Sequence, residues 1–506
     1  MNDGLGRGGG GPFGRKFGRC GPNLGYDNAM SPVRCLEPSR RRVLQQAAAV
    51  GALLPLALPR MARAGETAHR LVAAPARAAI VGANFPETEV WAYNGSVPGP
   101  LLRVKRGTKL HVVLENQVAD ATTLHWHGLR LPNAMDGVPG LTQKPVRRGE
   151  SFVYEFAAGD SGTYWYHPHW ESHEQVERGL QGALIVEEDA PPAVDRDILW
   201  VLDDLRLSAE ARIVEDFANF FDVSHAGRLG NTVTVNGRIA EEFAVRAGER
   251  IRLRLLNTAN GRIFGLRFGA LAPRLIATDG HAIDPHTPAD NRIVLGPGMR
   301  ADLILDCSGK PGERVTIVDD FYPRQAYRLL DFVYGPEPPL RDAPPNTPIA
   351  LAPPALPEPK LAEAERHAIT FGGGMMGSLR EAEFQGTRRP MREIMTHGMA
   401  WAVNGKVVSG HMHEPLLSLK LGRTYVLAME NDTAWHHPIH LHGHAFKVIA
   451  RNGAPAPRAE WRDTVLMDPK ERIDIAFVAD NQGDWMLHCH VLEHQAGGMM
   501  AVVRVG

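Results

Sequence analysis

The sequence predicts an all-β protein made of three copies of one module. Branched and polar residues alternate between glycine-containing turns, without a sustained helical period, and the 506 residues include 52 glycines. The alternating run also recurs: a glycine precedes it and an asparagine ends it nine residues later, in Gly107–Asn116, Gly248–Asn257 and Gly422–Asn431. A chain of this length exceeds one ordinary core, so we expect several domains.

Composition excludes several classes of protein. The 56 basic and 57 acidic residues give a formal charge of −1, which provides no electrostatic basis for binding nucleic acid or an anionic membrane. Hydrophobic residues make up 44% and charged residues 22% of the chain, as in globular proteins. Four cysteines are too few for a disulfide scaffold. The 22 histidines instead suggest metal binding.

Residues 1–64 are predicted to be a disordered leader that ends in a signal peptide. The pair Arg40-Arg41 precedes an apolar run from Ala47 to Leu58, which is too short to span a bilayer as a helix. Small residues then stand at the two positions that a signal peptidase recognises, in Ala62–Ala64. This order resembles a twin-arginine signal. We therefore expect the twin-arginine export machinery to deliver the protein to the periplasm, without stable membrane insertion after processing.

Three domains are predicted for the mature chain: residues 65–190, residues 191–334 and residues 361–506. A second shared segment supports the repeat, since PVRRGESFVYEF, GPGMRADLILD and DPKERIDIAFVAD occur in turn. Residues 335–360 are rich in proline and are predicted to link the second domain to the third.

Histidine pairs occur at matched positions of the first and third modules. The pairs are His125/His127 and His167/His169 in the first, and His440/His442 and His488/His490 in the third. The middle module has Leu266 and Phe268 instead of the first pair. Because residues i and i+2 lie on one face of a strand, both imidazoles of a pair point to the same place. The four pairs predict an eight-imidazole site between the outer modules, suited to copper, zinc, iron or nickel.

Cys489 narrows the choice of metal. It lies between His488 and His490, and its side chain is expected on the opposite face of the strand. The third module also offers His437, His494 and Met499. Two histidines, a thiolate and a more distant methionine are the ligands of a blue-copper electron-transfer centre. An electron could then pass from the thiolate to the eight-imidazole site through one residue of backbone.

Four motifs together resemble the multicopper oxidases, in particular the three-domain bacterial laccases and cuprous oxidases. They are HWHG, WYHPHW, HPIHLHGH and HCHVLEHQAGGMM, and the resemblance covers nearly all of the mature chain. It implies three cupredoxin-like Greek-key β-sandwich domains, of which the second has no copper ligands. It also implies an oxidoreductase that oxidises a reducing substrate in one-electron steps and reduces O2 to water.

The resemblance further implies which residues hold four copper ions. His437, Cys489 and His494 would bind the type 1 copper, with Met499 as the axial ligand. His125 and His440 would bind the type 2 copper. The type 3 pair would be bound by the remaining histidines, namely His127, His167, His169, His442, His488 and His490.

Proton delivery has one candidate and one departure from the family pattern. Asp136, in LPNAMDGVPG, matches an acid that bacterial relatives place near the type 2 copper; a turn residue before Gly137 is the alternative interpretation. Several bacterial relatives have a glutamate directly after the second type 1 histidine. Gln495 stands there in this chain, and an amide cannot titrate.

The electron donor stays open between phenolic or other aromatic compounds, Cu(I) and Mn(II). Six methionines lie between Phe371 and His413, namely Met375, Met376, Met391, Met395, Met399 and Met412. Thioethers favour Cu(I), but a flexible Gly-Met loop over the type 1 site explains them equally well. Two other functions are alternatives: an exported scaffold that keeps its ligands, and a copper-binding or storage protein without oxidase turnover. A storage protein would not need the connection through Cys489.

Overall fold

The computed structural model describes residues 66–410 and 414–506. The predicted leader and twin-arginine signal lie outside the described residues, as do His411, Met412 and His413. None of the described helices is long and apolar enough to cross a membrane.

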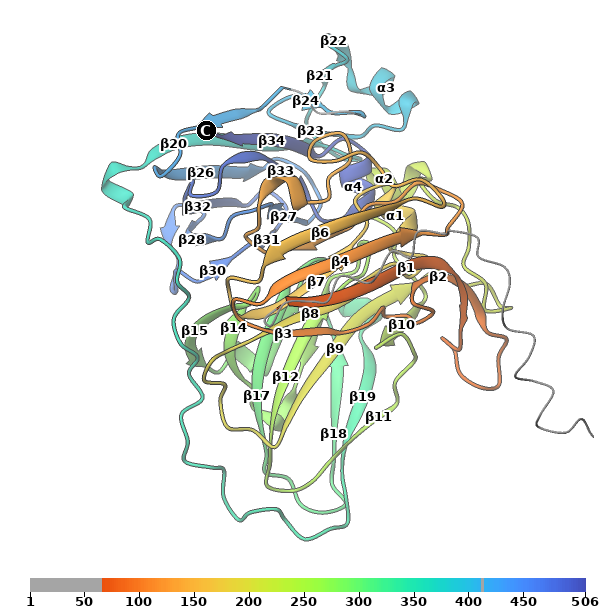
Figure 1. The fold of residues 1–506 in the computed structure, drawn as a ribbon, viewed down its shortest axis with the longest axis vertical. Coiled ribbons are helices and arrows are strands. Elements are labelled where there is room, and N and C mark those ends of the chain that lie inside the picture. Colours follow the sequence, from red (N-terminus) through yellow and green to blue (C-terminus); the bar gives the residue numbers. More distant parts are fainter. Residues whose placement is uncertain (1–65, 411–413) are drawn as a thin grey trace, which may run out of the picture. The chain divides into compact units, whose positions relative to one another are not determined.

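Two four-stranded sheets enclose the first hydrophobic core (Figure 1). One sheet has the order β2 (Thr88–Tyr93), β1 (Glu66–Ala78), β4 (Lys109–Asn116) and β6 (Ser151–Ala157). The other has the order β3 (Leu102–Lys105), β8 (Gly182–Glu187), β7 (Gly162–His167) and β5 (His125–His127). Along β4, Leu110, Val112 and Leu114 are buried while the residues between them are partly exposed, which is the alternation that the sequence predicted.

A six-stranded and a five-stranded sheet enclose the second core. The first has the order β10 (Thr232–Val235), β9 (Arg196–Leu205), β12 (Glu249–Asn257), β17 (Arg300–Cys307), β14 (Arg274–Thr278) and β15 (His281–His286). The second has the order β11 (Glu242–Val245), β19 (Tyr327–Tyr334), β18 (Arg314–Asp319), β13 (Phe264–Arg267) and β16 (Arg292–Leu295). Leu266 and Phe268, which replace a histidine pair here, are fully buried in this core.

The third core lies between a ten-stranded and a five-stranded sheet. The larger sheet has the order β22 (Thr387–Pro390), β21 (Glu381–Phe384), β24 (Lys406–Val407), β23 (Trp401–Val403), β20 (Glu365–Gly373), β26 (Thr424–Asn431), β32 (Arg472–Val478), β28 (Phe446–Arg451) and β29 (Ala454–Pro455), and β30 (Trp461–Arg462) pairs with β28. The smaller has the order β25 (Leu417–Leu419), β34 (Met500–Val505), β33 (Gly483–Cys489), β27 (His437–Leu441) and β31 (Thr464–Met467).

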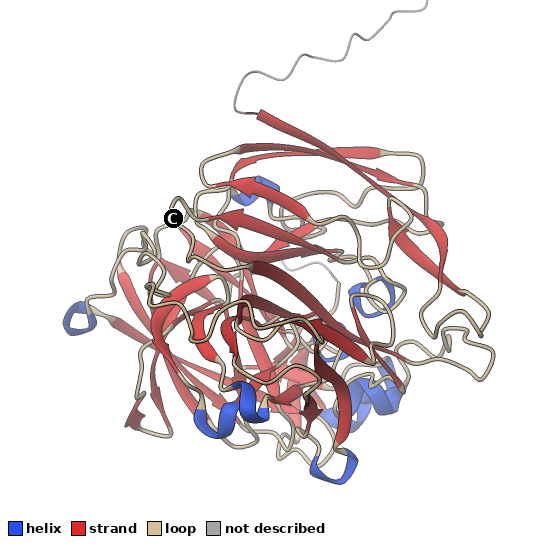
Figure 2. Ribbon diagram, turned by 90° about the horizontal axis from the view of Figure 1, so that it is seen from below, coloured by secondary structure: helices blue, strands red, loops and turns tan. Residues whose placement is uncertain are grey.

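Helices contribute little to the described chain, as Figure 2 shows. The α-helices are α1 (Ser172–Gln175), α2 (Phe220–Ser224), α3 (Met391–Ile394) and α4 (Leu492–Ala496). The 3₁₀ turns are η1 (Asn133–Met135), η2 (Gly269–Leu271), η3 (Ala289–Asn291), η4 (Pro323–Gln325), η5 (Leu361–Glu363) and η6 (Met395–His397). The predicted fold class, all-β with three cupredoxin-like sandwiches, is confirmed, while the exact domain boundaries stay a prediction.

The asparagines that end the three repeated runs have one structural task. Asn116, Asn257 and Asn431 are buried at the ends of β4, β12 and β26. Each side-chain amide donates hydrogen bonds at 2.7–2.9 Å to two backbone carbonyls, one in the loop that follows and one 30–38 residues further along the chain. These bonds satisfy carbonyls that would otherwise be buried without partners. In the outer modules, the loops that are fixed in this way lead directly to the strands with the histidine pairs.

Candidate metal centres

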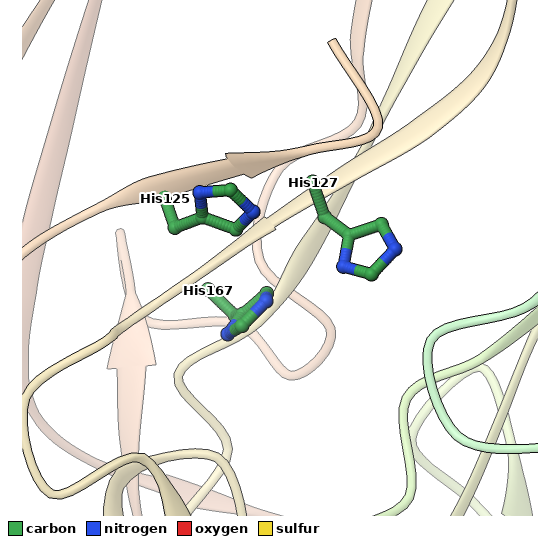
Figure 3. Close-up of side chains that lie close together, drawn as sticks. All are labelled: His125, His127 and His167. Atoms are coloured by element: carbon green, nitrogen blue, oxygen red, sulfur yellow. The ribbon is translucent and has the colours of Figure 1, made fainter. Parts of the chain in front are cut away.

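The structure brings the eight paired histidines together in one buried group, which we call the histidine cage. Its members are His125, His127, His167, His169, His440, His442, His488 and His490, and all are at most 5% exposed. Strand pairing sets the positions, because His125 lies opposite His167 between β5 and β7, and His440 lies opposite His488 between β27 and β33. Figure 3 shows the His125, His127 and His167 rings gathered around one space.

Strand alternation explains only one of the four pairs completely. His125 and His127 both lie within β5. In the other pairs the strand ends before the second histidine, since His169, His442 and His490 follow the last residues of β7, β27 and β33. The turns that follow the strands, as well as strand alternation, therefore determine where these three rings point.

Ring nitrogens converge within the cage as metal ligands would. The potential ligand atoms of His125, His440 and His442 lie within 4.8 Å of one another, and the same holds for His169, His442 and His488. Rings from the two outer modules stack in pairs: His127 on His440 with centroids 3.8 Å apart, and His125 on His442 at 3.9 Å. The cage is thus assembled from both outer modules, as predicted.

The unpartnered nitrogens show that these residues fit a group of metal ions. Among the described residues, no hydrogen-bond partner is present for the buried Nε2 atoms of His125, His167, His169 and His440, for Nδ1 of His127, or for either ring nitrogen of His490. Burial is the main cause that lowers the pKa of His167, His169, His442 and His488 well below its ordinary value, with the neighbouring imidazoles adding to it. Neutral imidazoles with free lone pairs are the form that binds metal.

Asp136 contacts two rings of the cage from its buried side chain. His442 donates from Nδ1 to the Asp136 carboxylate at 2.9 Å. His125 donates from Nδ1 to the backbone carbonyl of Asp136 at 2.8 Å, with the carboxylate 3.2 Å away. These contacts hold both protons on Nδ1, which turns both Nε2 lone pairs toward the cage. The Asp136 side chain thus lies at the cage, and its role in proton delivery stays a prediction.

Sequence reasoning missed a second carboxylate at the cage. His127 donates from Nε2 to Asp463 Oδ1 at 3.1 Å, and His440 donates from Nδ1 to the Asp463 backbone carbonyl at 2.8 Å. Although burial alone would raise the pKa of Asp463, the Arg300 guanidinium and the hydrogen bonds from these histidines bring it well below the ordinary value. Nothing in the spacing of WRDTV indicated this role, since its partners come from other parts of the chain.

The second candidate centre lies around Cys489. Its sulfur is 3.5 Å from Nδ1 of His437 and 3.6 Å from Nδ1 of His494, and the two nitrogens are 3.1 Å apart. The centre of this triangle is about 2.0 Å from each of the three atoms. First-row metal ions bind imidazole at about 2.0 Å and thiolate at about 2.3 Å, so the triangle has the size of a metal site. Burial and the neighbouring imidazole lower the pKa of His437 well below its ordinary value, and burial lowers that of His494 to about 3.

The outer nitrogens of both histidines are held in place by hydrogen bonds. Thr433 Oγ1 lies 2.8 Å from Nε2 of His437, and Nε2 of His494 donates to the backbone carbonyl of His225 at 2.7 Å. Met499 is fully buried in the same core, and its carbonyl accepts a hydrogen bond from the Cys489 backbone nitrogen at 3.1 Å. The residues present therefore suit one ion bound by two imidazoles and a thiolate.

The middle module closes the outer side of the cysteine centre. Phe221 is 65% exposed and stacks on the His225 ring with centroids 4.1 Å apart. The His225 ring also contacts the partly exposed Trp435 at 5.1 Å. Met375 is joined to this surface by hydrogen bonds of its backbone to Ser224 and to the Trp435 indole. We call Phe221, His225, Trp435, Met375 and Met376 the aromatic rim.

The methionine-rich segment is mostly regular structure rather than a loose loop. It contains β21, β22, α3 and β23, and Met391 is buried in a small core of its own. Met395 and Met399 pack against cores, whereas Met375 and Met376 are 38% and 72% exposed. Of the methionines in this segment that the structure describes, only Met375 and Met376 belong to the aromatic rim.

Other polar side chains next to the candidate ligands have mainly packing contacts. His444 is buried between Phe477 and Trp485. His436 is partly exposed beside Phe321. The Gln495 amide contacts Nδ1 of His169 at 3.2 Å, so it touches the cage without supplying a titratable group.

Comparisons with known proteins agree with this arrangement. Family models described as multicopper oxidase match residues 77–191 and 385–506. The chain is 29% identical over 464 residues to the multicopper oxidase MmcO of Mycobacterium tuberculosis, covering 84% of each chain. It is 32% identical to a multi-copper oxidase from Pseudomonas thermotolerans whose crystal structure superimposes with a TM-score of 0.76. This match covers 87% of this chain and 99% of that one. The multi-copper oxidase from Pseudomonas parafulva is 35% identical, with a TM-score of 0.74, and the match covers 86% of this chain and 99% of that one.

Proposed function

This chain belongs to the multicopper oxidase family, and on that premise we propose that the two candidate centres together bind four copper ions. The cysteine centre takes the type 1 copper, with His437, Cys489 and His494 as ligands and Met499 as the axial ligand. His125 and His440 take the type 2 copper. The other six histidines of the cage take the type 3 pair. The convergence of otherwise unpartnered buried nitrogens is the observation that supports this assignment.

The protein is a copper-dependent oxidoreductase that couples one-electron oxidation of a reducing substrate to the reduction of O2 to water. Bound copper supplies the one-electron redox chemistry and the site of dioxygen reduction. The polypeptide supplies the connection, because Cys489 is covalently continuous with His488 and His490 of the cage. An electron on the sulfur has one residue of backbone to cross on either side.

Oxygen uptake by copper-loaded protein tests this function. We expect a blue absorption band, and uptake of O2 that depends on an added donor and proceeds without release of hydrogen peroxide. A ligand-bearing scaffold or a storage protein would bind copper but consume no O2. Colourless protein, or blue protein that takes up no O2 with any donor, would contradict the proposal.

The aromatic rim favours a planar aromatic electron donor. His494 is fully buried, and its Nε2 donates to the backbone carbonyl of His225, so the segment around His225 connects this ligand to the aromatic rim. Phe221 and His225 present stacked aromatic faces at this place, and Trp435 lies beside them. Aromatic rings bind such faces by offset stacking or edge contacts. The nearby carboxylate of Asp432 is already paired with Lys470 at 2.6 Å, which leaves it less available to a hydrated cation.

Replacing Phe221 by alanine should weaken binding of aromatic donors. One aromatic contact contributes about 0.5–1.5 kcal/mol, so KM for a methoxyphenol should rise roughly 2–10-fold with little change in kcat. Phe220→Ala is the matched control, since Phe220 is 47% exposed on the same helix but has no ring contact with His225. Equal effects of the two substitutions on KM would argue against the rim as the donor site.

Cu(I) is the second candidate donor, because two exposed thioethers, Met375 and Met376, lie in the rim. Soft sulfur ligands select Cu(I). Steady-state rates with Cu(I), Mn(II) and a methoxyphenol will rank the three donors. A Cu(I) rate that falls on Met376→Leu, with the phenol rate unchanged, would favour the cuprous substrate.

For the cellular location we propose export to the periplasm through the twin-arginine pathway, on the sequence of residues 39–64. Changing Arg40-Arg41 to Lys-Lys should leave the full-length precursor inside the cell, because the pathway depends on the arginine pair. Fractionation and N-terminal sequencing measure this, and a mature start near Gly65 is expected for the unchanged protein. Normal processing of the variant would exclude this route.

We also propose the domain limits 65–190, 191–334 and 361–506, with a linker between the last two.

A further inference from the structure

The middle module has no histidine in the cage, yet it forms part of the cage wall. Gly298, in the turn before β17, lies against two of the rings. A Cβ atom at this position would be 2.8 Å from His490 Cδ2 and 3.0 Å from His127 Cε1. Gly298 also has a φ of 81°, which favours glycine. The middle module therefore reaches the cage directly.

Arg300 follows two residues later, as the first residue of β17, and is fully buried. Its guanidinium forms a two-pronged pair with Asp463, from Nη1 to Oδ1 at 2.8 Å and from Nη2 to Oδ2 at 2.6 Å. The remaining donors are also used, since backbone carbonyls of Thr163, Gly298 and Asp279 accept at 3.0–3.1 Å. A buried guanidinium with all its donors satisfied has one fixed orientation.

Asp463 transmits that orientation to the cage. One of its carboxylate oxygens, Oδ1, accepts from both Arg300 and Nε2 of His127, and it lies 3.4 Å from Nδ1 of His440. Asp279 of the middle module secures the same segment, because its carboxylate lies 3.2 Å from the backbone nitrogen of Thr464 and accepts from Arg300 N at 2.9 Å. Contacts thus run from the middle module, through the third, to a histidine of the first.

Among the three repeats, only the middle module places a buried arginine at the position of Arg300 and pairs it with another module. The residues equivalent to Arg300 by strand pairing are Ser151 and Arg472, which lie opposite Glu115 and Glu430. Both are exposed, and Arg472 pairs with Glu430 at the surface. In the middle module Leu256 replaces the glutamate opposite Arg300. The arginine therefore has no acidic partner across its own strand pair and pairs with Asp463 of the third module instead.

The glycine of HWHG is explained by the same pair. A Cβ atom at Gly128 would lie 2.3 Å from Nη2 of Arg300 and 2.5 Å from Oδ2 of Asp463. Space for the arginine–aspartate pair is thus kept by the first module, directly after His127. The Arg300–Asp463 ion pair therefore contacts or joins residues of all three modules.

We propose that Arg300 is a positioning residue for the oxygen-reducing copper site. It holds Asp463, whose carboxylate accepts from His127 and whose backbone carbonyl accepts from His440, so that both rings present their lone pairs to the metal. The inference rests on the proposed function of the cage. It makes the middle module a functional part of the oxygen site as well as a spacer. Residues that orient metal ligands in this way typically account for about 10–100-fold in metal affinity.

Copper binding by an Arg300→Met variant tests the proposal independently of turnover. We expect copper affinity at the cage, measured by chelator competition, to fall about 10–100-fold. The type 2 signal in electron paramagnetic resonance and the near-ultraviolet type 3 band should weaken, while the blue type 1 band stays. Arg300→Lys keeps the charge but cannot form the two-pronged pair, so it should restore the cage only partly.

Arg252→Met is the matched control. Arg252 is equally buried in the same sheet and pairs with Asp302 and Glu188, but its described contacts include no histidine. Thermal unfolding of the metal-free variants measures the general cost of losing a buried arginine, which should be similar for both. Unchanged cage affinity in Arg300→Met, equal losses in Arg252→Met, or full wild-type affinity in Arg300→Lys would overturn the proposal. Failure of the unchanged protein to bind copper at the cage would instead overturn the function on which it rests.

Discussion

Replacing Cys489 by serine is expected to remove the blue absorption and to lower kcat at least about 10³-fold, which corresponds to about 4 kcal/mol in the activation barrier. A thiolate is a soft ligand that suits a blue-copper centre, whereas a serine hydroxyl is a hard donor. The sulfur lies 3.5–3.6 Å from both imidazoles of the centre, so the substitution removes the ligand without changing the size of the site. Absorption spectra of copper-loaded protein and steady-state O2 uptake measure both effects.

Cys307→Ser is the control for this substitution. Cys307 is the other free cysteine among the described residues and is buried in the middle module, where burial raises the pKa of its thiol to about 12. The same change of sulfur to oxygen there should leave both the blue band and the oxidation rate unaltered. A Cys489→Ser protein that stays blue, or a Cys307→Ser protein that loses its colour, would contradict the assignment of the type 1 site.

The parts of this site that the sequence predicted are those whose side-chain directions depend only on neighbouring residues of the chain. A histidine pair two residues apart on a strand specifies one direction without knowledge of the rest of the fold, and His125 and His127 illustrate this in β5. Repetition at equal offsets then related the outer modules to each other. Cys489 could be placed because both of its neighbours are members of the cage.

The parts that the sequence did not predict depend on contacts between distant segments. Arg300 and Asp463 are 163 residues apart, and His494 and His225 are 269 residues apart. No spacing rule connects such residues, and an arginine at the start of a strand or a backbone carbonyl in a loop has no sequence signature. For the methionine-rich segment, composition left a Cu(I) site and a flexible loop as alternatives, and it did not reveal that Met391 and the strands around it pack a small core.

Substituting asparagine for Asp136 should lower turnover about 10–100-fold and leave the blue band unchanged. The loss follows from the contacts of the carboxylate, which accepts from Nδ1 of His442 at 2.9 Å and lies 3.2 Å from Nδ1 of His125. An asparagine has nearly the same shape, but one of its two polar atoms is a donor. If its oxygen accepts from Nδ1–H of His442, its NH2 group faces Nδ1–H of His125, which keeps only the backbone carbonyl of residue 136 as an acceptor.

The spectra should separate this effect from a general loss of stability. The type 1 ligands are not among the described contacts of Asp136, so the blue band reports an intact third module, while the type 2 signal should change with the orientation of His125. Asp302→Asn is the control, since it removes an equally buried carboxylate that pairs with Arg252 and Arg254 instead of with histidines. That variant should be less stable to heat but have normal type 2 signals. Wild-type turnover in Asp136→Asn would remove Asp136 from the mechanism, because a carboxylate that supports two ligands of the oxygen site cannot be neutralised without affecting the rate.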